Sequence, residues 1–487
     1  MTGAGDGLPR GWSIELDPHA RRTDDGRTLI GGFPLRVLRF SEAGRRWLDA
    51  VAAGGAAPTS PAARALARRL VDGGLAVPRP TPAAHHRAAD VAVVIPVRDD
   101  AEGLRTTLAT LGPVGAVVVV DDGSRDPAAV RAVAAAVDAT VIRHEVAKGP
   151  GAARQRGWQA SRQPVVAFVD ADVELPVGWV ERLLAHLDDP DLAAVAPRIR
   201  SRAGRAPRWL ARYEAARFPL DLGPLPAPVR PASRVSYVPT AVLLVRRDAL
   251  LAVGGFDPAL HLGEDVDLVW RLAAAGRSVR YEPEVVAHHP SRATAWAALR
   301  QRFRYGTSTT PLAERHGRAG APLGISGWSA LAWLAALLGH PGLGGAVAAG
   351  TTAALAPKLR GLDHPVAESL HLAGKGHLYA GLAVADALRR PWWPLALVLG
   401  WQVRRSRPAL LAAVLVPPLL EWRQDRPALD PARYAALRLL DDVAYGAGVW
   451  AGCARGRSVA ALLPRFSGPV DPPTRPDGSP VSPTAAT

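Results

Sequence analysis

Acidic side chains follow three apolar segments of the sequence, at the point where each segment ends. They are Asp99, the run Asp121-Asp122-Gly123-Ser124, and the pair Asp170 and Asp172. A period of two residues places the carboxylates of Asp170 and Asp172 on one side of an extended chain. Ligands of open α/β sheets bind beyond the carboxyl ends of the strands, and a divalent cation that bridges phosphates takes oxygen ligands. The repetition indicates a cation and phosphate site, although a turn with a helix N-cap explains each motif taken alone.

A fourth acidic run opens a predicted helix. Glu264, Asp265 and Asp267 directly follow Gly263, and the helix is expected to end at Gly276. Acidic residues in the first turn stabilise any helix N-terminus, so capping explains one of them. Three acids after a glycine-rich turn indicate, in addition, a carboxylate that removes the proton from a bound hydroxyl acceptor.

Two adjacent histidines, His288 and His289, follow the predicted strand Val279–Tyr281. Imidazole is a common metal ligand, so one of them is a candidate to complete a metal site. A surface or packing role explains an isolated histidine pair equally well.

Four apolar strands alternate with amphipathic helices in the middle of the chain. The expected strands are Val91–Ile95, Ala116–Val120, Thr140–Arg143 and Val165–Val169. Such runs, separated by helices, are typical of a parallel sheet that is covered on both faces. We therefore expect an α/β domain over residues 89–315, with the acidic groups at its strand ends.

The first 88 residues form a separate small α+β domain in this prediction. Short strands surround a turn at Asp24-Asp25-Gly26, and a helix from Ala62 ends at Gly73 as a glycine C-cap. A strand returns after that glycine, and a proline-containing linker follows.

Residues 316–463 form a hydrophobic helical region. Its apolar segments are Ile325–Leu338, Trp392–Val403 and Leu410–Leu420, with paired arginines beside the middle one. A span needs about 20 apolar residues, and each segment is short or broken by proline. We expect these helices to associate with the cell membrane, either as clean spans or, equally, as interfacial or re-entrant helices. The membrane surface is then a partner, and the catalytic domain is expected to be cytoplasmic. A buried helical core is the alternative, and the proline-rich residues 464–487 are expected to be disordered.

Composition limits the remaining possibilities. The chain has 487 residues, a net charge of +15 and one cysteine, Cys453. One cysteine excludes an internal disulfide and a cysteine-based zinc cluster. The positive charge alone does not indicate which polyanion the protein binds. We expect no nucleic acid partner, because the sequence shows neither a basic strand interleaved with aromatic residues nor a recognition helix. The N-terminus lacks the pattern of a secretory signal.

From Val91 to Pro311 these motifs, in this order, resemble the family 2 glycosyltransferases. The resemblance implies the GT-A fold, which is Rossmann-like with a mostly parallel sheet. It implies a nucleotide-sugar site formed by Pro96, Asp99, Asp122, Arg154 and Asp170. Arg98 and Gln155 depart from the family pattern, so the details of nucleoside recognition are open.

The same resemblance implies the catalytic groups. Asp172 and His288 would hold Mg²⁺ or Mn²⁺ on the donor diphosphate, with His289 as the other candidate ligand. Asp265 would be the general base, supported by Glu264. Such enzymes invert the anomeric centre in a single displacement.

The whole chain is similar to the mycofactocin-system members of that family, because the front segment Leu29–Ser41 and the hydrophobic C-terminal part accompany the core. This implies transfer of β-linked glucose from UDP-glucose to a peptide-derived redox cofactor or its precursor. Residues 1–88 also resemble winged-helix domains that recognise precursor peptides. Peptide docking is therefore one hypothesis for this domain, and a structural extension is the other.

Two alternatives share the core motifs. A membrane polysaccharide synthase would need several clear spans and a Gln-x-x-Arg-Trp motif, which the run from Gln301 to Tyr305 matches only in part. A scaffold without catalysis has no need of a metal ligand together with a base. We therefore expect an enzyme, a metal-dependent hexosyltransferase.

Overall fold

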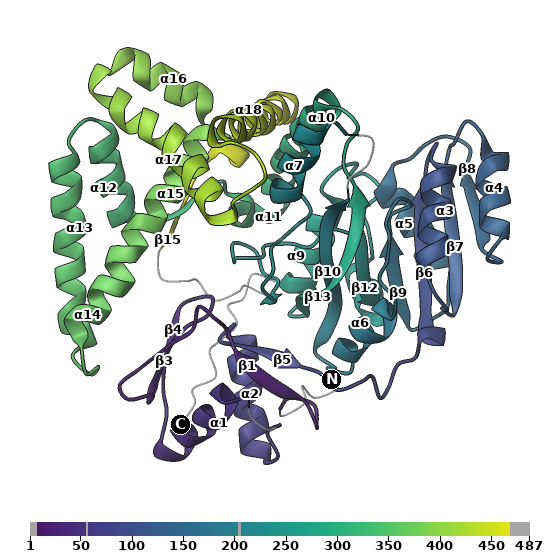
Figure 1. Cartoon of the computed structure of the whole chain (residues 1–487), viewed down its shortest axis with the longest axis horizontal. Coiled ribbons are helices and arrows are strands. Elements are labelled where there is room, and N and C mark those ends of the chain that lie inside the picture. Colours follow the sequence, from purple (N-terminus) through teal and green to yellow (C-terminus); the bar gives the residue numbers. More distant parts are fainter. Residues whose placement is uncertain (1–6, 55–56, 203–205, 468–487) are drawn as a thin grey trace. The chain divides into compact units, whose positions relative to one another are not determined.

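The computed structural model describes residues 7–54, 57–202 and 206–467. The chain divides into two compact units (Figure 1). The first contains residues 1–204 and 217–291, and the second contains residues 205–216 and 292–487.

The first unit is built on an eight-stranded mixed sheet. Its order is β11-β13-β10-β12-β9-β6-β7-β8. β6, β7, β8 and β9 are mutually parallel, β10 is parallel to β13, and β12 runs antiparallel to both its neighbours. The strands are β6 (Val91–Val97), β7 (Ala116–Asp122), β8 (Thr140–His144), β9 (Val165–Val169), β10 (Leu192–Arg202), β11 (Ala227–Pro228), β12 (Val242–Arg246) and β13 (Ser278–Pro290). The four predicted strands and the predicted α/β class are confirmed.

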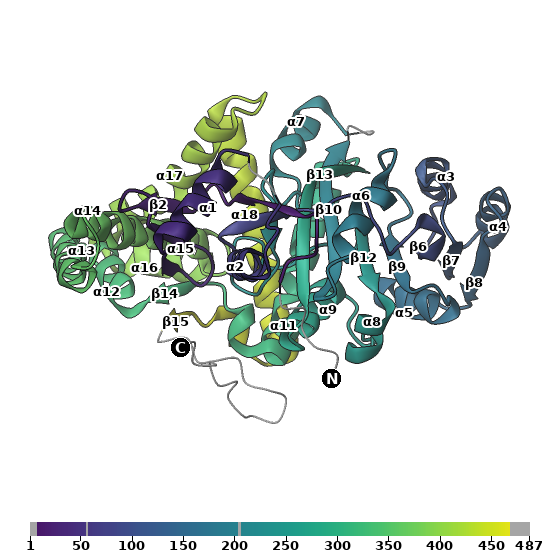
Figure 2. The same cartoon turned by 90° about the horizontal axis from the view of Figure 1, so that it is seen from below.

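Helices cover both faces of this sheet. Figure 2 shows α3 and α4 on one face and α5 and α8 on the other. The helices are α3 (Ala101–Thr110), α4 (Pro127–Ala135), α5 (Pro150–Ala160), α6 (Trp179–Leu187), α8 (Arg247–Val253) and α9 (Glu264–Ala274), and a 3₁₀ turn, η1 (Ala88–Asp90), precedes β6. A Cβ at Gly157 of α5 would lie 2.3 Å from a Val94 methyl, so this glycine lets α5 pack directly on β6.

The N-terminal part of the first unit combines two small antiparallel sheets with two helices. β1 (Ser13–Leu16) pairs with β5 (Ala76–Arg79), and the other sheet has the order β2-β3-β4. Its strands and the helices are β2 (Arg21–Thr23), β3 (Thr28–Gly31), β4 (Arg36–Arg39), α1 (Glu42–Ala52) and α2 (Pro61–Asp72). Trp12, Leu29 and Leu70 lie in its core. The winged-helix assignment stays a prediction.

A buried ion cluster fixes this N-terminal part to the large sheet. Arg68 of α2 donates to both carboxylate oxygens of Asp189, at 2.6 and 3.0 Å. Arg280 of β13 donates to the same carboxylate at 3.3 Å and lies over the Trp12 ring. Asp189 is fully buried, so loss of either arginine would leave its charge poorly compensated.

The second unit is almost entirely helical. Its regular elements are α7 (Arg208–Arg217), α10 (Ala295–Thr307), α11 (Thr309–His316), β14 (Gly324–Ser326), α12 (Gly327–Leu337), α13 (Pro341–Leu355), α14 (Pro365–Ser369), α15 (Lys375–Arg389), α16 (Trp393–Gln402), α17 (Arg407–Asp425), α18 (Pro431–Gly456) and β15 (Arg465–Ser467). Short turns join them, namely η2 (Gly317–Gly320), η3 (Ala356–Leu359), the π-helical η4 (Leu370–Gly374), η5 (Arg404–Ser406) and η6 (Ala460–Leu462).

The second unit begins before the predicted boundary at residue 315, because α10 packs closely on α18. A Cβ at Gly306 would lie 2.1 Å from the Tyr445 carbonyl oxygen, and one at Gly448 would lie 2.0 Å from that of Phe303. These glycines let the two helix backbones come into contact.

The expected membrane association is wrong. In the described part of the chain, no helix combines the length and the apolar character that a membrane crossing requires. α12 has 11 residues and α16 has 10, whereas a span needs about 20. This finding overturns the predicted localisation at the cell membrane with a cytoplasmic catalytic domain, and the membrane surface as a partner is not supported.

The predicted disordered tail contains one short strand. Residues Arg465–Ser467 form β15, which pairs in parallel with β14. The rest of that prediction, residues 468–487, lies outside the described residues.

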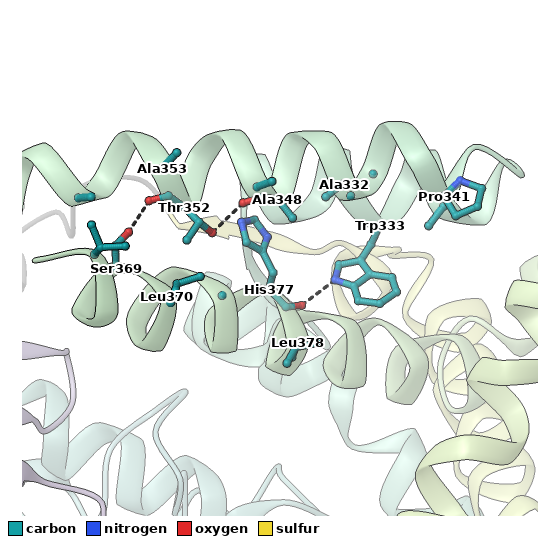
Figure 3. A pocket seen from close by; sticks show the side chains of 17 residues that line it. Ala332, Trp333, Pro341, Ala348, Thr352, Ala353, Ser369, Leu370, His377 and Leu378 are labelled. Atoms are coloured by element: carbon teal, nitrogen blue, oxygen red, sulfur yellow. Dashed lines mark hydrogen bonds between the residues drawn. The ribbon is translucent and has the colours of Figure 1, made fainter.

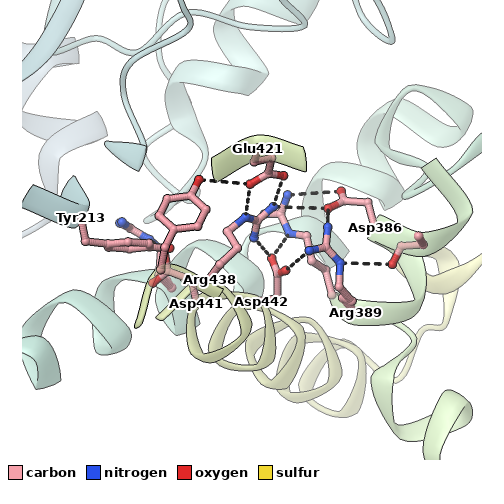
Figure 4. A network of polar contacts seen from close by, with 11 residues as sticks. Tyr213, Asp386, Arg389, Glu421, Arg438, Asp441 and Asp442 are labelled. Carbon is pink, nitrogen blue, oxygen red and sulfur yellow. Dashed lines mark hydrogen bonds and ion pairs between the residues drawn. The ribbon is translucent and has the colours of Figure 1, made fainter. Parts of the chain in front are cut away.

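A buried ionic network joins three helices of the second unit (Figure 4). Arg438 of α18 donates to Glu421 of α17 at 2.9 Å and to Asp442 one turn further along its own helix. Arg389 of α15 donates to Asp386 at 2.9 Å and lies 3.4 Å from the Asp442 carboxylate. Asp442 is only 1% exposed, so its charge is balanced by these arginines rather than by water.

Replacing Asp442 by alanine is expected to destabilise the second unit by about 3–5 kcal/mol, because two buried guanidinium groups lose their shared partner. Urea denaturation followed by circular dichroism measures the loss. Arg433→Ala on the same helix is the matched control, since its ion pair with Asp430 is exposed and its loss should cost less than about 1 kcal/mol. Equal effects of the two substitutions would contradict this assignment.

Candidate functional site

One threonine of α3, Thr107, fixes the backbone of the loop that follows β9. The Thr107 hydroxyl of α3 lies 3.2 Å from the Asp170 carbonyl oxygen and 2.9 Å from the Val173 carbonyl oxygen, and it accepts from the Val173 amide. The Asp170 amide donates to the Ala241 carbonyl at 3.0 Å. Thr107 is fully buried, so Asp170 and Asp172 are presented by a fixed backbone. Nothing in the sequence pattern had marked Thr107.

Arg154 connects this loop to the acidic helix α9. Its guanidinium donates to Asp170 at 2.6 Å and to Glu264 at 2.7 Å. Arg154 is 4% exposed and lies near the Phe256 ring. The structure therefore brings together three of the residues predicted from separate motifs.

Asp265 follows Glu264 in the first turn of α9 and remains partly exposed. Burial and the neighbouring Glu264 charge raise the pKa of Asp265 to about 7, against the opposing effects of the Val266 amide and Arg154. A carboxylate with a pKa near 7 accepts a proton readily at neutral pH, as a general base must.

Asp172 faces His289. The His289 Nε2 lies 3.2 Å from the Asp172 carboxylate, and its Nδ1 lies 3.0 Å from the Pro290 carbonyl oxygen. Because Nδ1 donates to that carbonyl, Nε2 carries a proton only when the ring is cationic. A shared divalent cation could take the place of that proton between the nitrogen and the carboxylate, so the pair fits a divalent metal.

His288, the preferred ligand in the sequence analysis, is not brought to Asp172. Its backbone exchanges two hydrogen bonds with Glu174, at 2.8 and 2.9 Å. Successive side chains of a strand point to opposite faces, so the buried His289 and the half-buried His288 of β13 diverge. Within the part of the chain that the structure describes, no three His, Cys, Asp or Glu side chains gather as a metal-binding group.

The predicted nucleoside-pocket acids are hydrogen-bonded within the protein. Asp122 accepts from the Lys148 and Gly149 amides, both at 2.8 Å, and lies 2.8 Å from the His144 Nδ1. It thereby shapes the loop before α5. Asp99, exposed and at φ 53°, accepts from the Arg125 amide and links the ends of β6 and β7. Pro96, in β6, is half-buried.

Gln155, a departure from the family pattern, has a positioning role. Its side-chain oxygen accepts from the Trp158 indole and the Phe256 amide, each at 2.8 Å, and its nitrogen donates to the Gly254 carbonyl at 3.2 Å. A Cβ at Gly255, where φ is +70°, would lie 2.3 Å from that oxygen. The hydrogen bonds of Gln155 fix the turn that precedes α9.

Comparison with known proteins agrees with this arrangement. Residues 92–250 match the glycosyl transferase family 2 model. A pre-mycofactocin glycosyltransferase from Mycobacterium tuberculosis is 42% identical over 474 residues, which cover 94% of this chain and 98% of the relative. The chain belongs to the pre-mycofactocin glycosyltransferase family.

More distant relatives are less similar to this chain. Glycosyltransferase AglE from Haloferax volcanii is 26% identical over 226 residues, covering 44% of this chain and 71% of the relative. The solved structure of a Pyrobaculum calidifontis mannosyltransferase, in complex with GDP-Man and Mn²⁺, is 18% identical at a TM-score of 0.42. It covers 76% of this chain and 89% of that one.

The site of this glycosyltransferase thus combines three chemical features. Asp265 can accept a proton, and Asp172 and His289 are candidate ligands of a cation. Arg154 joins Asp170, at the end of β9, to Glu264, beside Asp265. The chain is a family 2 glycosyltransferase with a GT-A-like α/β fold and a mostly parallel sheet.

Proposed function

We propose that the chain transfers glucose from UDP-glucose to a hydroxyl of mycofactocin, a peptide-derived redox cofactor, or of its precursor, with inversion at the anomeric carbon. The raised pKa and the placement of Asp265 support the part of this proposal in which a carboxylate removes the proton of the acceptor hydroxyl. The donor is proposed from the resemblance of the motifs to family 2 glycosyltransferases. The similarity to the M. tuberculosis pre-mycofactocin glycosyltransferase supports the acceptor class.

Asp265 would act as the general base. It takes the proton of the acceptor hydroxyl while that oxygen forms a bond to the anomeric carbon and the bond from this carbon to the diphosphate oxygen breaks. Glu264 keeps Arg154 in place and raises the proton affinity of Asp265. Asp170 accepts a hydrogen bond from Arg154. It would contact the donor ribose or the metal.

Asp172 and His289 would hold the divalent cation. Mg²⁺ commonly binds through one or two carboxylates plus substrate phosphates, so Asp172 and the donor diphosphate would supply its main ligands and His289 would add a nitrogen ligand. When bound, Mg²⁺ or Mn²⁺ would neutralise charge on the departing diphosphate. The fixed loop above Thr107 keeps Asp172 in place for that role.

We expect Asp265→Asn to lower the rate of acceptor-dependent UDP release from UDP-glucose by about 10²–10⁴-fold. The wild-type rate should rise as the pH increases through about 7, since only the ionised base works and its pKa lies there. Glu264→Gln removes a like charge, so it should move this rise to lower pH. An unchanged pH profile in Glu264→Gln would contradict the coupling, and full activity of Asp265→Asn would contradict the base.

The two histidines provide a matched test of the metal site. We expect His289→Ala and Asp172→Ala to weaken Mn²⁺ binding, measured by electron paramagnetic resonance in the presence of UDP, about tenfold or more. His288→Ala should bind Mn²⁺ as the wild type does, because its side chain points away from Asp172. The reverse order of the two histidine variants would exclude the proposed pair.

We also propose that the N-terminal part docks a peptide along β4. Among the described residues, β4 pairs only with β3, so its other edge has free backbone groups. Val37 of β4 exposes an apolar side chain, as do Phe33 and Leu35 in the turn just before the strand, and Arg36 and Arg39 add positive charge. An unprotected apolar edge strand is suited to pair with an extended peptide.

The double substitution Leu35→Lys and Val37→Lys is expected to weaken binding of a labelled mycofactocin precursor peptide about tenfold or more, measured by fluorescence anisotropy. Both side chains are exposed, so folding should persist, whereas deletion of residues 1–88 would uncover the buried Asp189. Val177→Lys, at a fully exposed position outside this part, is the control. Equal peptide binding by all three proteins would support the structural-extension hypothesis instead.

A further inference from the structure

The helix that carries the proposed base has no side-chain cap at its start. α9 follows Gly263, which has a left-handed backbone conformation with φ +79° and offers no side chain to the amides of the first turn. A first turn without such a cap is easily displaced, because its amides have no partner within the helix. The position of Asp265 in that turn therefore depends on contacts between α9 and other elements.

Arg154 provides one such contact, which by itself does not fix the helix. It donates to the Glu264 carboxylate at 2.7 Å. One contact at one end does not prevent rotation of α9 about its own axis. Side-chain tips lie about 5–6 Å from a helix axis, so a rotation of about 10° displaces the Asp265 carboxylate by about 1 Å. A displacement of this size can lower a rate about 10²-fold.

Arg271, further along α9, joins three groups. Its Nε donates to the Asp267 carboxylate at 2.8 Å, and its two terminal nitrogens donate to the Val253 carbonyl at 2.6 Å and the Gly255 carbonyl at 2.7 Å. Asp267 is buried and lies one turn earlier in the same helix, so it fixes the direction of the guanidinium. The planar, forked guanidinium suits such an arrangement, and a lysine ammonium does not reproduce it.

Gln155 of α5 holds the same turn. Its amide nitrogen donates to the Gly254 carbonyl at 3.2 Å, and its oxygen accepts from the Phe256 amide at 2.8 Å. Three consecutive carbonyls, of residues 253–255, therefore accept from side chains of α5 and α9. α8 ends at Val253, and carbonyls at the end of a helix lack partners within it, so these bonds satisfy groups that folding would otherwise leave open. The turn thereby links α5, which carries Arg154, to α9.

Trp270 provides a contact in a second direction. Its indole nitrogen donates to the Ser236 carbonyl at 2.7 Å, and its ring is buried. Successive side chains of a helix point about 100° apart, so Trp270 and Arg271 hold α9 from two directions. Together with Arg154 at the first turn, they restrict both the tilt and the rotation of the helix.

We propose that Arg271 and Trp270 are positioning residues for the transfer reaction, which fix the rotation of α9 and thereby orient the Asp265 carboxylate toward the acceptor hydroxyl. The proposal rests on the assignment of Asp265 as the general base. The hydrogen bonds of these two side chains go to Asp267 and to backbone carbonyls, so they act on Asp265 through the helix.

Arg271→Lys and a matched control test the first contact. The lysine keeps a positive charge beside Asp267 but cannot reach both carbonyls. Arg246→Lys is the control, because Arg246 also makes three hydrogen bonds, to the carbonyls of residues 187, 189 and 192. Arg246 pairs with Val165, at the opposite end of β9 from the site. Both substitutions should therefore lower the melting temperature, and only the first should affect α9.

Trp270→Phe and a second control test the other contact. The Trp333 indole, in the second unit, donates to the His377 carbonyl at the same distance of 2.7 Å (Figure 3). Trp333→Phe thus removes an equivalent hydrogen bond that has no connection with α9.

The experiment combines kinetics with hydrogen exchange on the full chain. We expect Arg271→Lys and Trp270→Phe to lower kcat for acceptor-dependent UDP release about 10–10²-fold, with KM for UDP-glucose changed by less than about twofold. Exchange of the amides of residues 264–268, measured by mass spectrometry, should be faster in both variants. The two controls should keep the wild-type kcat and the wild-type exchange of this segment.

Three results would overturn the proposal. These are wild-type exchange of residues 264–268 in both test variants, faster exchange with an unchanged kcat, and an equal loss of kcat in the controls, which would indicate a general loss of stability. Failure of the base assignment is distinguishable from all three, because Asp265→Asn would then keep full activity.

Discussion

The site depends on one buried guanidinium. Arg154 joins Asp170, at the end of β9, to Glu264, in the first turn of α9. Three carboxylates, those of Asp170, Glu264 and Asp265, otherwise lie close together at a protected edge, where like charges repel strongly because the local dielectric is low. Arg154 offsets that repulsion, and α5 holds Arg154 in place because Gly157 lets the helix pack directly on the sheet.

Much of this arrangement was predictable from the sequence. The strands Val91–Val97, Ala116–Asp122 and Val165–Val169 are buried on both faces, so their apolar runs are continuous and easily recognised. Parallel strands end at the same edge, so the acids that follow them lie along one edge of the sheet. The acidic start of the helix at Glu264 was expected to face this edge, and Arg154 joins Glu264 to Asp170 at the end of β9.

Side-chain direction was not predictable. β13 is 13 residues long and its pairing with β10 shifts register between Pro197 and Arg198, so alternation could not be counted from its start to His288 or His289. Thr107 and Gln155 act through contacts distant in the chain, for which a single sequence carries no signal. The apolar segments at α12 and α16 were expected with nearly their observed bounds, so the error lay in assigning helices this short to the membrane.

The proton affinity of Asp265 shows which electrostatic effect dominates. Its position in the first turn of α9 favours the ionised form through the helix dipole, an effect of about 0.3–1 kcal/mol. The pKa is nevertheless raised from 3.8 to about 7, equivalent to about 4 kcal/mol in the opposite direction. Burial and the charge of Glu264 therefore disfavour the ionised form of Asp265 by several times the free energy with which the helix dipole favours it. Arg154 lowers the pKa of Asp265 only a little, because its two hydrogen bonds go to Asp170 and Glu264 rather than to Asp265. The neighbouring acid thus makes Asp265 a stronger base, and the arginine that compensates Glu264 leaves that strength intact.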